Sequence, residues 1–137
     1  MSISEHKDFE ATSGNLKLVR TFAREVFQRS EKLNGQQEEL VLAIAEAAQN
    51  IVKHAYQGVV NPDKMRVKIS FDEKELVIDL LDRGKPVVPA NIKPRKLDDI
   101  KPGGLGTFFI GQIMDEVLFK TSKSEDWVNH LILKKTI

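Results

Sequence analysis

The chain has 137 residues, of which 41% are hydrophobic and 30% charged, with no cysteine and a formal net charge of +1. This length fits one domain with a buried core. The absence of cysteine excludes a fold held by disulfides and any zinc or iron–sulfur site with Cys ligands. The near-balanced charge offers no overall basic field for nucleic acid.

Membrane and export signals are also missing from the sequence. No apolar stretch approaches the roughly 20 residues of a membrane helix. The polar residues 1–10 lack the apolar centre of a signal peptide. We therefore expect a cytoplasmic protein with one domain over residues 1–137 that binds neither nucleic acid nor membranes directly.

Two helices are expected in the first half of the chain. A short edge strand, Lys7–Ala11, comes first, and Ser13 is placed to cap the next helix. Apolar residues then recur at helical spacing, at Leu16, Val19, Phe22, Ala23, Val26 and Phe27. A second helix is expected from about Gln36 to Tyr56, with an apolar stripe of Leu40, Ile44, Ala47, Ile51 and Ala55.

The second half of the chain predicts four strands, a long loop and a third helix. The alternation of Met65–Phe71 indicates a half-buried strand, and a hairpin leads to a second strand at Leu76–Leu81. Residues 85–102 hold four of the five prolines, so we expect a lid-like loop there. The last elements are a helix and two strands, at Thr107–Met114, Val117–Thr121 and Trp127–Lys134.

Paired strands between helices favour an α+β fold over a doubly wound one. The expected architecture is a two-layer α/β sandwich in which helices cover a mixed, largely antiparallel sheet.

Glu46, Asn50 and Lys53 lie on one side of the expected second helix. At about 100° per residue they fall within about 60° of one another, opposite the apolar Ile44 and Ala48. A carboxylate can act as a general base, and an Asn oxygen can bind a hard cation such as Mg²⁺. A solvated polar face would show the same pattern, so this motif alone leaves both interpretations open.

Asp82 and Gly84 follow the apolar strand Leu76–Leu81. A carboxylate fixed at the end of a strand can accept a hydrogen bond from an exocyclic amine, and a glycine lets a flat ring approach the backbone. Asp and Gly are also ordinary turn residues, and a simple turn is the alternative.

Gly103, Gly104 and Gly106 precede or open the third helix. Backbone amides at a helix N-terminus form a site for anions such as phosphate. The pattern is neither a P-loop, since no Gly-Lys-Ser/Thr follows, nor a dinucleotide fingerprint, since no strand directly precedes it. The alternative is a hinge of the lid.

The order of these three motifs resembles that of the GHKL ATPases, the superfamily of the gyrase, histidine-kinase and mismatch-repair ATPases. Residues 46–50 with 53–56 resemble its N-box, 82–86 its G1 box and 103–106 its G2 box. The opening residues 15–20 and the segment 111–117 resemble the anti-sigma factor serine kinases of bacteria in particular. The ordered set of boxes is specific, whereas each box alone is not.

The resemblance implies a site for ATP or ADP with Mg²⁺. Asn50 would ligate the metal, and Glu46 would be the catalytic residue that orients or deprotonates the attacking hydroxyl. Asp82 would bind the adenine amine and Gly84 would leave room for the ring. The phosphates would be held at the start of the third helix, by Gly104, Leu105, Gly106 and Thr107.

The resemblance also implies partners. Such kinases phosphorylate a serine of an anti-anti-sigma factor, sequester an RNA polymerase sigma factor, and typically form homodimers through the helical or N-terminal layer. Two alternatives stay open. One is a nucleotide-binding regulatory module without transfer activity, and the other is a switch kinase that acts without binding sigma.

The sequence departs from the family in its last hairpin. Many relatives have a Gly, often with a Thr, before the final strand, whereas residues 124–129 contain no Gly. Asn129 or Thr121 could replace that nucleotide contact.

We interpret His54 as chiefly structural and Trp127 as hairpin or core packing. Four cations of the lid are candidates to contact the γ-phosphate, and the sequence does not rank them: Lys93, Arg95, Lys96 and Lys101.

Overall fold

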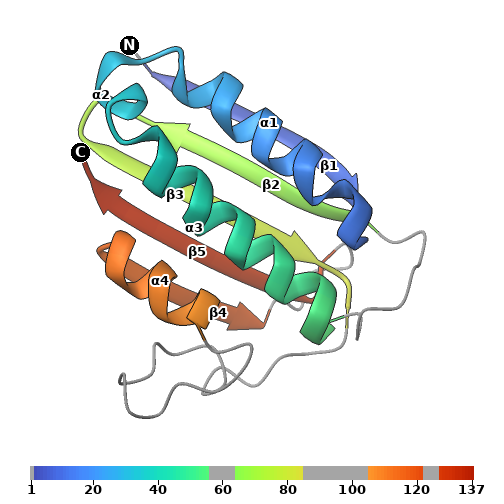
Figure 1. Ribbon diagram of the computed structural model, residues 1–137. Coiled ribbons are helices and arrows are strands. Elements are labelled where there is room, and N and C mark those ends of the chain that lie inside the picture. The colour runs from blue at the N-terminus through green and yellow to red at the C-terminus, as the bar shows by residue number, and fades with distance from the viewer. Residues whose placement is uncertain (1, 56–63, 85–104, 122–126) are drawn as a thin grey trace.

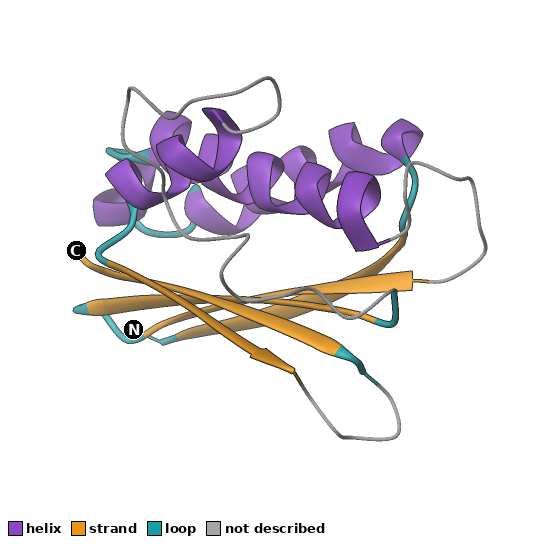
Figure 2. Ribbon diagram, turned by 90° about the horizontal axis from the view of Figure 1, so that it is seen from below, coloured by secondary structure: helices purple, strands orange, loops and turns teal. Residues whose placement is uncertain are grey.

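The computed structural model describes residues 2–55, 64–84, 105–121 and 127–137. These residues form two layers. Helices cover one face of a single sheet, and the opposite face of the sheet carries none of the described helices (Figure 1, Figure 2). The expected two-layer α+β sandwich is confirmed.

The sheet has five strands in the order β1-β2-β3-β5-β4. All four pairings are antiparallel, so the expectation of a largely antiparallel sheet is confirmed without a parallel pair among the described strands. The strands are β1 (Ile3–Glu10), β2 (Lys64–Phe71), β3 (Glu75–Asp82), β4 (Glu116–Thr121) and β5 (Asn129–Thr136).

The helical layer contains α1 (Leu16–Phe27), the short α2 (Glu31–Asn34), α3 (Gln37–Asn50) and α4 (Leu105–Ile113). A 3-10 turn, Ser13–Asn15, precedes α1, and a π-helical segment, Ile51–Ala55, continues α3. No helix in the described ranges is long and apolar enough to cross a membrane.

Two local expectations at the N-terminus were wrong. The first strand spans Ile3–Glu10, so it begins earlier than expected and leaves out Ala11. Ser13 does not cap α1, because it lies inside the 3-10 turn and Asn15 occupies the N-cap position without a side-chain cap bond. The Asn15 side chain instead donates to the carbonyl of Glu10 at 3.2 Å, which ties the turn to the end of β1.

The core lies between the two layers. Side chains alternate between the faces of a strand, so every second residue of β2 and β3 points to the helices. On the strands, the buried side chains are Met65, Val67, Ile69, Phe71, Leu76, Ile78 and Leu80. The helices contribute a matching stripe at helical spacing, which includes Val19, Ala23, Phe27, Leu40, Ile44 and Ala47.

The topology brings three element ends together. β1, β3 and β4 run in the same direction, because β1 and β3 are both antiparallel to β2, and β3 and β4 to β5. α3 ends at the end of the sheet where β3 stops at Asp82 (Figure 1). α4 leads into the start of β4, so its first turn points back toward the same end. We call this region the Asp82 end of the sandwich.

Candidate nucleotide site

Asp82 is a buried carboxylate at the last position of β3, with 2% of its surface exposed. Its Oδ1 accepts two hydrogen bonds of 2.8 Å, from the backbone N–H of Gly84 and from the side-chain amide of Asn129. Burial raises the pKa of Asp82 above its ordinary value, while the bonds from Asn129 and Gly84 oppose that shift. The fold thus keeps an acidic group in the interior, which packing alone does not require.

Asn129 is the first residue of β5 and stands directly opposite Asp82 in the sheet register. It is also buried, at 2% exposure. The backbone N–H of the preceding Val128 donates to the Asp82 carbonyl at 2.8 Å. The start of β5 therefore holds both the backbone and the side chain of Asp82.

From the sequence, Asn129 was only a candidate to replace the nucleotide contact that relatives make from their last hairpin. The available signal is the alternation of Asn129 with Leu131 and Leu133, which places the amide on the face toward the helices. Thr121 of β4 pairs with Asn129, but its side chain lies outside the described residues. Asn129 is thus found to be the side-chain hydrogen-bond partner of Asp82 within the described residues.

Glu46 and Asn50 lie one turn apart near the end of α3, and both are half-buried. Ile44 and Ala48 on the opposite side are buried, while Lys53 is exposed. A fully solvated face would expose Glu46 and Asn50 as it does Lys53. The polar strip therefore borders other parts of the protein, and its roles in catalysis and binding stay predictions.

The helix changes its pitch immediately after Asn50. Ile51–Ala55 form a π-helical segment, a rare conformation that often occurs at functional sites. Ile51 and Val52 are both buried, so this segment continues the buried side of α3. The side chain of His54 lies outside the described residues.

The donor set fits Mg²⁺ held mainly by a nucleotide. Within the described residues no group of three or more His, Asp or Glu side chains could hold a metal ion. Asn50 offers one neutral oxygen, and Mg²⁺ commonly takes only one or two protein ligands while phosphates and water complete its shell.

α4 begins two residues earlier than expected, so Leu105, Gly106 and Thr107 form its first turn. The N–H groups of a first helical turn have no partner within the helix and can bind anions. Gly84 is buried beside Asp82. Gly103, Gly104, the lid at 85–102 and its four cations lie outside the described residues, as do the side chains of residues 105–107.

The other end of α4 is fixed to β5. The Lys135 ammonium donates to the Ile113 carbonyl at 2.7 Å. The Asp115 N–H donates to the Lys134 carbonyl at 2.9 Å, and the Asp115 carboxylate accepts from the Thr136 N–H at 2.7 Å. These contacts hold the helix whose first turn points to the Asp82 end.

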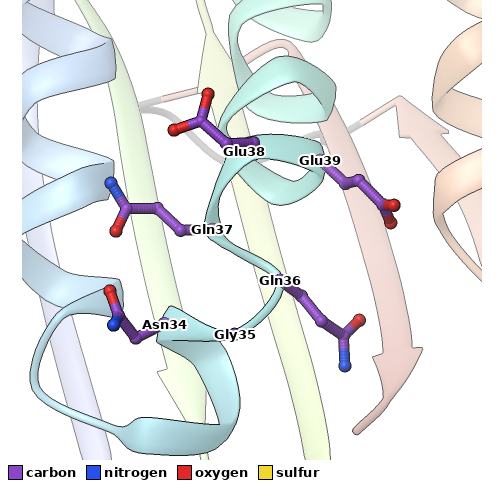
Figure 3. Close-up of a pocket in the computed structure, with 6 residues that line it drawn as sticks. All are labelled: Asn34, Gly35, Gln36, Gln37, Glu38 and Glu39. Carbon is purple, nitrogen blue, oxygen red and sulfur yellow. The ribbon is translucent and has the colours of Figure 1, made fainter.

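A separate hollow lies at the corner between α2 and α3. It is lined by six consecutive residues, Asn34–Glu39, whose longer side chains point in different directions (Figure 3). It stands at the start of α3, a helix about 21 Å long, whereas Asn50 is at its other end. We therefore do not assign this hollow to the candidate site.

The buried carboxylate, the polar end of α3 and the first turn of α4 are the parts expected of an ATPase of the histidine-kinase-like class. The family model described as "Histidine kinase-like ATPase domain" matches residues 9–135, and the chain belongs to this family.

Serine-protein kinase RsbW from Staphylococcus aureus (strain bovine RF122 / ET3-1) is 30% identical over 115 residues, which cover 78% of this chain and 72% of that protein. RsbW of strain MRSA252 matches to the same extent.

A solved structure supports the fold. The chain with the RsbU and RsbW domains of Rv1364c from Mycobacterium tuberculosis superposes with a TM-score of 0.64 and 17% sequence identity. The match covers 97% of this chain and 31% of that longer chain.

Proposed function

We propose that this protein is an ATP-dependent protein serine kinase that phosphorylates an anti-anti-sigma factor and sequesters an RNA polymerase sigma factor. The observation that carries the proposal is the buried Asp82, held through Oδ1 by Gly84 and Asn129. Its membership of the ATPase family and its similarity to the RsbW serine-protein kinases support the same function.

Asp82 is suited to recognise adenine. Both hydrogen bonds that Asp82 accepts from the described residues fall on Oδ1, so Oδ2 is the oxygen that would accept from the exocyclic amine. The Asn129 bond favours the ionised carboxylate, and a charged acceptor makes the stronger hydrogen bond. Gly84 would leave space for the ring next to this carboxylate.

The phosphates and the hydroxyl would be handled by the two helices. Asn50 would hold Mg²⁺, and backbone amides at Gly104, Leu105, Gly106 and Thr107 would bind the phosphates. When bound, Mg²⁺ would neutralise charge on the phosphate oxygens. The serine hydroxyl would attack the γ-phosphorus while its proton passes to Glu46, the bond to ADP breaks and ADP leaves.

The proposed partners are an anti-anti-sigma factor that carries the acceptor serine, a sigma factor, and a second copy of this chain in a homodimer. Transfer without sigma binding would indicate the switch kinase instead. Nucleotide binding without transfer would indicate a regulatory module.

The deciding experiment is single-turnover transfer of labelled phosphate from ATP to an anti-anti-sigma protein of the same genome, beside equilibrium ATP binding. We expect transfer with the wild-type acceptor and none when its serine is replaced by Ala. Glu46→Gln should bind ATP within about twofold of wild type and transfer about 10²–10⁴-fold more slowly, the range of a positioned general base. Asn50→Ala should weaken both binding and transfer.

Glu39→Gln is the matched control, since it makes the same change at an exposed position at the start of α3. It should match wild type in both measurements. Wild-type transfer by Glu46→Gln would remove the catalytic role of Glu46, and binding without transfer by the wild type would reject the kinase.

A further inference from the structure

Trp127, the only tryptophan of the chain, stands just before β5 and contacts two arginines. The guanidinium carbon of Arg83 lies 4.9 Å from the centre of the indole ring, and that of Arg66 lies 5.3 Å from it. Both distances are within the range of cation–π attraction, which is strongest for Trp. We call these three residues the Trp127 stack.

Arg66, one member of the stack, is held in place by a residue of β1. The Arg66 guanidinium donates to both oxygens of Asp8, at 2.7 and 3.2 Å, and the two residues are directly opposite in the β1–β2 register. The bond to Arg66 lowers the pKa of Asp8. This two-point pairing limits the rotation of Arg66 and so gives Trp127 a defined surface to rest on.

The other member, Arg83, belongs to the turn that follows β3, and its side chain is exposed. Three consecutive residues at the start of β5 and just before it, Trp127, Val128 and Asn129, contact the turn formed by Asp82, Arg83 and Gly84. Trp127 contacts the Arg83 side chain, the Val128 N–H donates to the Asp82 carbonyl, and the Asn129 amide donates to the Asp82 carboxylate.

We propose that Trp127 is a positioning residue for the adenine-binding carboxylate, because its contact with Arg83 holds the Asp82–Gly84 turn against β5. The inference rests on the proposed nucleotide site and deepens it. Trp127 does not itself touch the nucleotide. It restricts the turn before the nucleotide arrives, so that less freedom is lost on binding.

Loss of the stack should therefore weaken the contribution of the adenine amine and leave the phosphate contacts unchanged. The ratio of the affinities for ATP and for purine riboside triphosphate, which has hydrogen in place of the amine, isolates this contribution. A wild-type ratio of about 5 to 150 corresponds to one buried hydrogen bond. A general structural defect would lower both affinities and leave the ratio unchanged.

The test measures both affinities by calorimetry with Mg²⁺ for four variants. Trp127→Leu and Arg83→Leu should each lower the ratio by about 3- to 10-fold, the effect of the Arg83–Trp127 cation–π contact, and no further than to a ratio of 1. Trp127→Phe keeps an aromatic face and should retain at least half of the wild-type ratio. Arg29→Leu is the control: it removes the exposed ion pair between Arg29, which follows α1, and Glu5 of β1, and it should leave the ratio unchanged.

The outcomes separate the two proposals. A wild-type protein that binds both nucleotides equally would reject the adenine site at Asp82. A wild-type ratio that Trp127→Leu fully retains would overturn the positioning role and leave the adenine site intact. An equal loss of both affinities in Trp127→Leu would also overturn it, since that result assigns Trp127 to general packing.

Discussion

Burial of the Asp82 carboxylate opposes folding at neutral pH, because a charged group loses its hydration in the interior. Its folded-state pKa is raised above the ordinary value of 3.8, so the folded protein holds this proton more tightly than the unfolded chain. The associated stability is fully present below pH 3.8 and is lost as the pH rises through the folded-state pKa. A group retained against this penalty is a candidate for function.

Asp82→Asn should therefore be at least as stable as the wild type at pH 7. The Asn side chain keeps an oxygen for Gly84 and Asn129 and removes the charge. Its advantage should shrink as the pH falls from 7 to 3.8, because Asp82 becomes protonated as the pH passes through its raised pKa. Thermal unfolding at both pH values measures the difference, and a loss of more than about 1 kcal/mol at pH 7 would contradict the argument.

For Asp8→Asn, we expect a change in stability with pH that has the opposite sign to that of Asp82→Asn. The Arg66 bond lowers the pKa of Asp8, so its stabilising effect is present at neutral pH and lost as the pH falls through the lowered value. The Asp8→Asn protein should be slightly less stable than wild type at pH 7 and should approach it in acid. The effect should be small, because about a third of each side chain is exposed.

The hairpin between β2 and β3 is the strained element of the described backbone. Glu73 has a φ of 80°, a conformation that disfavours any residue with a Cβ. The Asp72 carboxylate holds this turn by accepting from the N–H groups of Lys74 and Glu75, at 3.0 and 2.7 Å. The Lys32 ammonium donates to the Glu73 carbonyl at 3.1 Å and ties the turn to α2.

Glu73→Gly should consequently be more stable than Glu73→Ala by about 1 kcal/mol. Both changes remove the same side chain, so the comparison isolates the backbone strain. The midpoints and slopes of urea unfolding give the two free energies. Equal stability, or greater stability of the Ala variant, would show that the turn is not strained in solution.

For the whole molecule, local periodicity was sufficient to predict most elements. The alternation in Met65–Phe71 and the stripe through Leu40, Ile44 and Ala47 recur in the structure as buried faces. Both patterns arise from residues that are close in sequence. Ser13 was misplaced because a 3-10 turn and a helix begin with the same residue types.

The contacts of the site depend on residues far apart in the sequence. The Asp82–Asn129 hydrogen bond spans 47 positions, and it required the insertion of β5 between β3 and β4. The Trp127 stack brings residues from β2, the end of β3 and the approach to β5 into contact, and no local sequence pattern predicts these contacts. The sequence could therefore propose Asp82, Gly84 and Asn50 as candidate site residues, but it did not indicate that Gly84, Val128 and Asn129 donate hydrogen bonds to Asp82.

The most direct test of the proposed nucleotide site is ATP binding by the wild type, Asp82→Asn and Asp79→Asn, measured by calorimetry with Mg²⁺. Asp79 is the matched control, because it lies on the same strand but on the face away from the helices, where it pairs with His130 at 2.7 Å. We expect Asp82→Asn to bind ATP about 5- to 150-fold more weakly than wild type, since an amide would face the adenine amine. Asp79→Asn should bind within about twofold of wild type. Equal affinity of the wild type and Asp82→Asn, or no ATP binding by the wild type, would contradict the proposal that Asp82 binds the adenine of ATP.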